Sequence, residues 1–157
     1  MWQRFVRVNN HSAVESCGFE NSLALGAGGR SYLGNLHYCT PWSQNQPASR
    51  QIVADFIARQ DKTLINHGYV LSQAEMKRRF VIKNLFFYKG LSLRDYQRQF
   101  SSEVLSDFPL LGDFIKQDYC HQQDNRIQLT AQGMALSDQL GPLFISPEVR
   151  RLETHKR

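Results

Sequence analysis

The strongest constraint on the fold is a helix start followed by a long apolar segment in the second half of the 157-residue chain. Ser72 and Glu75 form a capping box, in which the two side chains satisfy backbone amides that the first helical turn leaves free. Apolar side chains cover most sides of the following segment through Phe86, and Gly90 favours its end. Since a helix that is apolar on most sides must be buried, we expect it at the centre of a core.

Shorter elements are expected after this helix. Ser92 can cap a short helix, Pro109 lies near the first turn of another, and Thr130 can cap a last one. Between the last two, residues 119–129 are predicted to form a small hairpin. This order predicts a winged-helix-like unit over residues 70–145.

The first part of the chain has a different character. Pro47, Ile52 and Phe56 predict a connecting helix within residues 47–69. Within residues 1–46, short strands are expected at 4–8 and 22–25. Two strands with a polar loop cannot form a stable sheet alone, so they are interpreted as an edge of something larger. The expected fold class is α+β and mostly helical, ending in a basic tail at residues 146–157.

Composition narrows the classes of function. No apolar run approaches the roughly 20 residues that cross a bilayer, and the N-terminus is unlike a signal peptide, so we expect a cytoplasmic protein without membrane contact. The three cysteines and five histidines lack metal-site spacing, and the odd cysteine count argues against a closed disulfide framework. We therefore assign no metal ligand in this chain.

The net charge of +5 invites a nucleic-acid interpretation. The helix that would read DNA, over residues 108–116, carries Asp113 and only one lysine, so nucleic acid is not the favoured partner. Arg78, Arg79 and Lys83 add charge to the apolar helix. We favour the interpretation that their stems cover the core and their charges stay in water over the alternative of anion binding.

A glycine-rich stretch at residues 23–34 is the most informative for chemistry. Gly26, Gly28 and Gly29 follow a short apolar segment, and glycines let backbone amides approach a ligand. A tight structural turn explains them equally well. Next along the chain, His37, Cys39 and neighbouring aromatic residues suit a pocket for a flat organic ligand, or simple packing under a loop. A nucleophilic Cys39 is the less favoured interpretation.

These segments, taken in order, resemble the C-terminal third of oxygen-independent coproporphyrinogen oxidases, a HemN-like family of radical S-adenosylmethionine (SAM) proteins. The resemblance covers about residues 17–145. The matching segments are residues 25–32, 78–85 and 127–133.

The resemblance implies a catalytic α/β barrel that binds an iron–sulfur cluster and SAM, followed by a mostly helical domain that helps cover the active site. By this comparison residues 1–46 are a remnant of the barrel edge, and residues 70–145 are the HemN-like C-terminal domain.

The resemblance also implies a set of cofactor-binding residues in the glycine-rich loop, which would lie near bound SAM. No catalytic residue is assigned. The cofactor-binding residues are Gly26, Gly28, Gly29, Ser31 and Tyr32.

The sequence departs from this family in lacking Cys-x-x-x-Cys-x-x-Cys, whose three thiolates leave one iron open for SAM. Whether the chain is an enzyme is therefore left open, and we expect no cluster on this chain alone. The expected partners are the N-terminal barrel portion and a tetrapyrrole-like small molecule. The alternative is a winged-helix nucleic-acid-binding or protein-interaction module.

Overall fold

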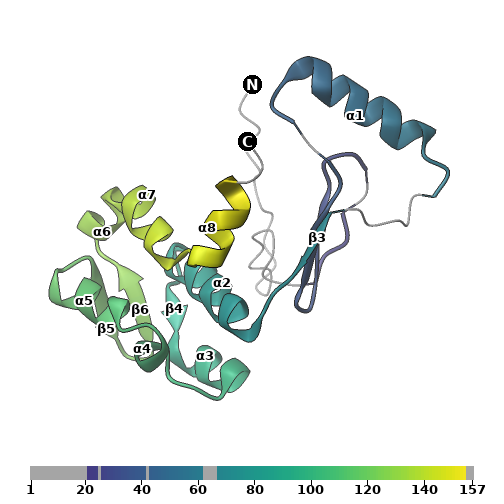
Figure 1. Cartoon of the computed structure of the whole chain (residues 1–157). Coiled ribbons are helices and arrows are strands. Elements are labelled where there is room, and N and C mark those ends of the chain that lie inside the picture. The colour runs from purple at the N-terminus through teal and green to yellow at the C-terminus, as the bar shows by residue number, and fades with distance from the viewer. Residues whose placement is uncertain (1–20, 25, 42, 62–66, 155–157) are drawn as a thin grey trace, which may run out of the picture. The chain divides into compact units, whose positions relative to one another are not determined.

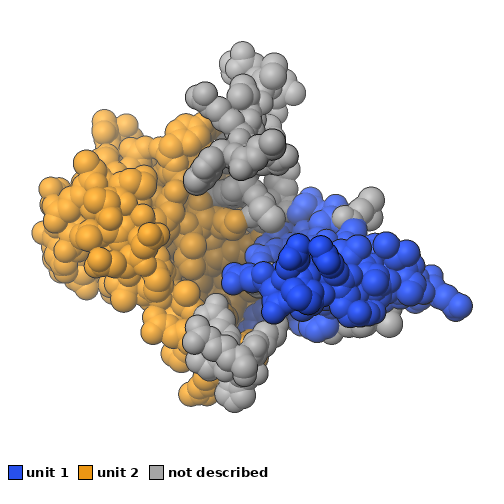
Figure 2. All heavy atoms as spheres, turned by 90° about the horizontal axis from the view of Figure 1, so that it is seen from above, with its two compact units in different colours: residues 1–70 blue, residues 71–157 orange. Residues whose placement is uncertain are grey.

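The computed structural model shows an α+β protein in which about half of the described residues are helical (Figure 1). The chain divides into two compact units, residues 1–70 and residues 71–157, coloured separately in Figure 2. The strand expected at residues 4–8 lies outside the described part of the chain. The structure describes residues 21–24, 26–41, 43–61 and 67–154.

Unit 1, residues 1–70, contains a three-stranded antiparallel sheet in the order β1-β2-β3. β1 and β2 form a hairpin, and β3 comes from beyond the helix that follows them. Of the strand expected at residues 22–25, the described residues 22–24 form a single bridge, between Ser22 and Tyr32, and residue 25 lies outside the described part of the chain. The sequence predicted none of these three strands. For β3, the neighbouring strand β2 is distant along the chain, so local patterning carries little information about their pairing. The strands are β1 (Arg30–Leu33), β2 (Leu36–Cys39) and β3 (Gly68–Val70).

Helix α1 (Gln46–Ala58) confirms the helix predicted in unit 1. Asn45 caps it by accepting a hydrogen bond from the amide of Ala48, and proline occupies the first turn. No residue of α1 is buried. Its apolar face is therefore only partly covered.

Unit 2, residues 71–157, begins with helix α2 (Gln73–Leu85). Ser72 accepts a hydrogen bond from the amide of Glu75, which confirms the predicted cap. The carboxylate of Glu75 forms an ion pair with Arg78, with 3.4 Å between Oε1 and Nε. The helix therefore starts as the sequence predicts, while its glutamate stabilises the next turn.

Four short elements follow α2. Ser92 caps α3 by accepting from the amide of Asp95, as predicted. The chain then turns through α4, which the sequence did not predict, into the helix expected after Pro109. The elements are β4 (Leu91–Ser92), α3 (Leu93–Phe100), α4 (Val104–Asp107) and α5 (Leu110–Lys116).

The predicted hairpin is confirmed as strands β5 (Cys120–Gln123) and β6 (Arg126–Leu129). Asp124, with φ 51°, forms the tight turn together with Asn125. β4 pairs with β6, giving an antiparallel sheet in the order β4-β6-β5. The short strand β4 thereby joins the start of unit 2 to its hairpin.

The end of unit 2 differs from the single closing helix that the sequence predicts. Thr130 accepts from the amide of Gly133 and caps the first short helix, as expected. The helical path is then broken into three pieces, and the basic tail contains one more helix. The elements are α6 (Ala131–Ala135), α7 (Ser137–Leu140), the 3₁₀ helix η1 (Gly141–Phe144) and α8 (Pro147–Thr154).

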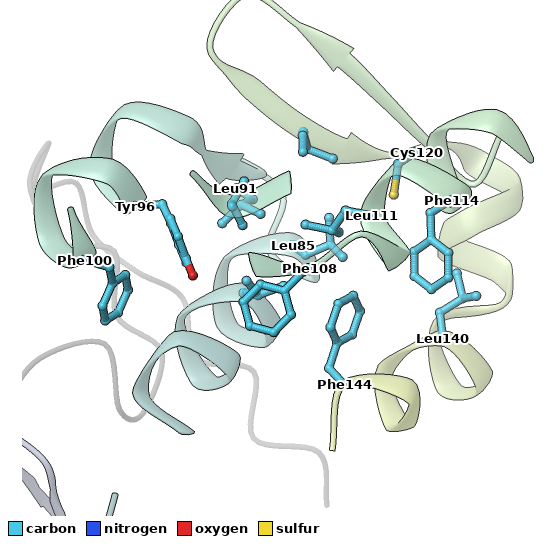
Figure 3. Close-up of a cluster of buried hydrophobic side chains, with 13 residues drawn as sticks. Leu85, Leu91, Tyr96, Phe100, Phe108, Leu111, Phe114, Cys120, Leu140 and Phe144 are labelled. Atoms are coloured by element: carbon cyan, nitrogen blue, oxygen red, sulfur yellow. The ribbon is translucent and has the colours of Figure 1, made fainter. Parts of the chain in front are cut away.

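The core is a single cluster of apolar side chains within unit 2 (Figure 3). Aromatic rings pack edge-to-face through it, as between Phe114 and Phe144 and between Phe108 and Phe144. Among the described residues, every buried apolar side chain belongs to this unit. They are Val81, Leu85, Leu91, Tyr96, Phe100, Val104, Phe108, Leu111, Phe114, Cys120, Ile127, Leu140 and Phe144.

Within the described ranges, none of the helices has both the length and the apolar content that a bilayer crossing requires.

Candidate functional site

The glycine-rich loop of unit 1 is a closed turn held by its own backbone. Gly26 and Gly28 have φ angles of 101° and 76°, which favour glycine. The carbonyl of Gly26 accepts hydrogen bonds from the amide of Gly29, at 3.2 Å, and from the hydroxyl of Thr40, at 3.1 Å. The loop is therefore tied both to itself and to the segment after β2.

The five predicted cofactor-binding residues occupy different environments. Open space surrounds the positions where side chains at Gly26 and Gly28 would stand. A side chain at Gly29 would instead press on Ala24, at 3.1 Å. Only the first two positions thus leave room for a ligand to approach the backbone.

The remaining two predicted residues are engaged within the unit. Ser31 is 1% exposed, and its hydroxyl accepts from the amide of Ala24 at 3.0 Å. The ring of Tyr32 stacks on His37, with 4.3 Å between ring centroids and 13° between ring planes. These contacts give Ser31 and Tyr32 structural roles in this unit. Binding of SAM by the loop stays a prediction.

A pocket of about 130 Å³ lies beside the loop. The sequence placed Ile52 and Phe56 on one helix face but did not place this face against the loop. The polar lining residues of the pocket, Asp55 and Arg59, follow the same helical spacing as Ile52 and Phe56. This spacing could have predicted that they share the face. The lining residues are Ala27, Thr40, Pro41, Ile52, Asp55, Phe56 and Arg59.

The segment predicted as a flat-ligand pocket or as packing forms β2 and its exit. His37 pairs with Tyr32 on β1 and with Tyr69 on β3, so an aromatic row crosses the sheet. Cys39 lies opposite Arg30 and is partly buried. The tryptophan at position 42 is outside the described residues. Of the described residues of this segment, Thr40 and Pro41 line the pocket.

The basic residues of α2 are largely engaged within unit 2. Arg78 pairs with Glu75, and its guanidinium lies over the ring of Phe108, 5.8 Å from the centroid. Lys77 donates to Asp107 at 2.8 Å. At Arg78 the charge is therefore held by groups of unit 2, whereas the favoured interpretation left it in water.

Asp107 gathers three donors at one carboxylate. Lys77, Ser102 and Tyr96 all donate to its Oδ2, at 2.8, 2.6 and 2.7 Å. The hydrogen bond from Lys77 makes the largest contribution in lowering the pKa of Asp107 to about 2. Burial, followed by the bond to Asp107, raises the pKa of Tyr96. The cluster therefore joins α2, α3 and α4 with an ionised aspartate and a neutral tyrosine.

The cysteines of the described residues do not fit an iron–sulfur cluster. The described residues include two cysteines, Cys39 and Cys120, whereas the family's cluster needs three thiolates. Burial raises the pKa of the Cys120 thiol to about 11, which disfavours the thiolate that iron needs. Within the described part of the chain, no three histidine, cysteine or acidic side chains gather as a metal site.

Comparison with models of protein families gives a match to unit 2. Residues 71–136 match the family model described as the HemN C-terminal domain. The match begins at the first residue of unit 2 and includes its sheet and most of its core elements. No curated protein and no solved structure matches the chain.

Proposed function

We propose, from the premise that residues 71–136 are the HemN C-terminal domain of a HemN-like radical SAM protein, that this chain covers the active site of such a protein and is not catalytic alone. The family match is the observation that carries the proposal. In the full-length protein, the family uses SAM and an iron–sulfur cluster. The chain's sequence has no Cys-x-x-x-Cys-x-x-Cys, so the cluster must be held by other residues.

In this proposal unit 2 is a winged-helix-like cap that helps to position a tetrapyrrole-like substrate. The order α2, β4, α3, α5, β5 and β6, with β4 beside β6, supports the winged-helix-like description. DNA recognition by α5 is not favoured. Its Lys116 lies 3.4 Å from Asp113 and is thereby partly neutralised, which leaves α5 poorly suited to phosphate.

Unit 1 is proposed to contact the radical SAM barrel and to present the glycine-rich loop to SAM. One row of side chains across its sheet is apolar: Leu33 pairs with Leu36, and Leu36 pairs with Val70. Leu33 and Val70 are 40% and 64% exposed. Exposed apolar side chains adjoining one another suit an interface, so this row is the proposed contact with the barrel.

The test mixes the full chain with the cluster-loaded barrel portion of a HemN-like protein. We expect the two to co-elute in size-exclusion chromatography and the chain to increase 5′-deoxyadenosine formation from SAM. Val70→Asp should weaken co-elution. Leu143→Asp, at a comparably exposed position in unit 2, should not. Failure of the unmodified chain to associate would count against the proposal.

A second measurement concerns the cluster. After reconstitution with iron and sulfide, the chain alone is expected to stay colourless, because its sequence lacks Cys-x-x-x-Cys-x-x-Cys. A stable brown absorbance that follows the protein through gel filtration would contradict the assignment of the cluster to other residues.

A further inference from the structure

The sheet of unit 2 has one face that the core does not cover. Across the hairpin, Gln123 lies opposite Arg126, and His121 lies opposite the next outward residue of β6, Gln128. Residues paired in this way share a face of the sheet, and so do residues two apart along a strand. The residue between the last two on β6, Ile127, is 0% exposed and belongs to the core. The other four side chains therefore form an outer face.

The turn after α2 is tied to this face by hydrogen bonds. Arg126 donates from Nη1 to the carbonyls of Lys89 and Gly90, at 3.2 Å each. The side-chain amide of Gln128 donates to the carbonyls of Tyr88 and Lys89, at 3.4 Å each. The turn is therefore held beside the sheet. The outer face, as we define it, consists of Tyr88, Lys89, His121, Gln123, Arg126 and Gln128.

Tyr88 gives this face an exposed aromatic ring. At 73%, it is the most exposed of the large apolar side chains that the structure describes. Its ring packs on that of Phe87, with 4.5 Å between the centroids. Because hydrogen bonds to its carbonyl hold the backbone in place, the ring loses little conformational freedom when a partner covers it. Rigid aromatic side chains of this kind are common anchors of protein interfaces.

The charge of the outer face is positive. Lys89 and Arg126 are both exposed, and no acidic residue belongs to the face, although Asp124 lies at its end in the hairpin turn. Nζ of Lys89 lies 5.7 Å from the centroid of the Tyr88 ring, so a cation and the aromatic ring stand side by side. No described residue engages Nη2 of Arg126. Carboxylates on a partner would therefore complement the face.

The small number of cations favours a protein partner over a nucleic acid. A nucleic-acid surface draws its affinity from many phosphate contacts made by lysine and arginine. The outer face offers two such residues, and Arg126 already uses one amino group to hold the turn. A short acidic segment needs no more than this.

We propose that the outer face of unit 2 binds an acidic segment of a partner protein. Carboxylates of the segment meet Lys89 and Arg126, and one of its apolar side chains covers the ring of Tyr88. The interaction goes beyond the proposed function, since it gives unit 2 a partner that is neither the substrate nor the barrel.

The test is fluorescence anisotropy on the full chain with a labelled synthetic peptide that has glutamates on both sides of one phenylalanine. We expect saturable binding that weakens as the salt concentration rises. The same peptide with glutamine in place of glutamate should bind about tenfold more weakly. A labelled single-stranded DNA oligonucleotide of equal net charge should bind more weakly than the glutamate peptide.

Two variants remove side chains of the face and keep the carbonyls that hold the turn. Tyr88→Ser should weaken binding of the glutamate peptide about tenfold, and Lys89→Gln about threefold. Lys116→Gln makes the same change of charge on α5, where the lysine side chain is 80% exposed. Leu152→Ser removes an apolar side chain that is 47% exposed on α8. Neither of these two control substitutions should change the affinity.

Several results would overturn the proposal. They are the absence of saturable binding of the glutamate peptide to the original chain, and equal binding of the glutamine peptide. Equal weakening by Lys89→Gln and Lys116→Gln would do the same, because it would mark a response to net charge alone. Tighter binding of the oligonucleotide than of the glutamate peptide would assign the face to nucleic acid instead. Each of these results leaves the proposed function intact, since that function rests on the family match.

Discussion

Gly133 shows how a single atom can decide whether unit 2 packs. A Cβ at this position would lie 2.8 Å from the carbonyl carbon of Tyr119 and closer still to its oxygen. The amide of Thr130 donates to that same oxygen at 3.0 Å. We expect Gly133→Ala to lower the free energy of unfolding by about 2–3 kcal/mol, measured by urea denaturation.

Gly112 provides the matched control. It lies inside α5, and nothing stands within 4 Å of the position that its Cβ would take. Gly112→Ala should therefore raise the free energy of unfolding by about 0.5–1 kcal/mol, because alanine favours helix. If both substitutions changed stability equally, the contact at Gly133 would not be the cause.

The Asp107 carboxylate predicts sensitivity to acid. Its pKa falls from 3.8 to about 2 on folding, chiefly through Lys77, so its contribution is present above about pH 4 and is lost as the pH falls toward 2. Solvent screening at this partly exposed group limits the contribution to about 1 kcal/mol. Asp107→Asn should flatten the dependence of urea-unfolding stability on pH between 4 and 2. An unchanged slope would contradict this role.

Tyr96 predicts how stability depends on pH in the alkaline range. Its raised pKa keeps the hydroxyl neutral in the folded state, so its contribution is present below about pH 10 and is lost above that pH as the unfolded tyrosine ionises. Tyr96→Phe should cost about 1 kcal/mol at neutral pH by removing the bond to Asp107. The variant should also lose less stability than the original chain between pH 10 and 11, measured by circular dichroism.

At the scale of elements, α8 is joined to unit 2 by polar contacts and does not contribute to the core. Ser146 caps it, and Arg150 donates to the carbonyl of Pro142 at 2.7 Å, but none of the α8 side chains that the structure describes is among the buried apolar ones. Ending the chain after Ser146 should lower the melting temperature by only a few degrees. Ending it after Leu143 removes Phe144, which is 1% exposed, and should prevent cooperative unfolding.

Several elements that depend on neighbouring residues were predictable from the sequence, although the local hairpin of β1 and β2 was not predicted. The caps at Ser72, Ser92 and Thr130 and the hairpin at residues 119–129 are local, and all four are confirmed. By contrast, β4 and β3 exist through pairing with distant strands, which periodicity does not reveal.

The candidate site was predictable to a similar extent. Two glycines of the loop, Gly26 and Gly28, could be predicted because their positive φ angles favour glycine. The charged residues of the pocket are Asp55 in α1 and Arg59 directly after it, and both look like ordinary surface residues until the helix is placed against the loop. Thr40 has no sequence signal at all, since its role depends on reaching the carbonyl of Gly26.

At the scale of the whole molecule, the two units should differ in autonomy. All buried apolar side chains of the described residues lie in unit 2, while the only buried residue described in unit 1 is Ser31. We therefore expect residues 71–157 to fold alone, with a cooperative thermal transition close to that of the full chain. Residues 1–70 alone should give no cooperative transition by circular dichroism. A two-state transition in the shorter unit would contradict this division.

The rate at which the buried thiol of Cys120 is alkylated measures how often the core of unit 2 opens. Shielded in the core with its pKa raised, this thiol can be alkylated only when the core opens, whereas the half-buried Cys39 reports on the other unit. Pulsed alkylation read by peptide mass spectrometry would then follow the opening rate of each unit in one sample. These opening rates would show whether an added partner slows the local unfolding of one unit, of the other, or of both.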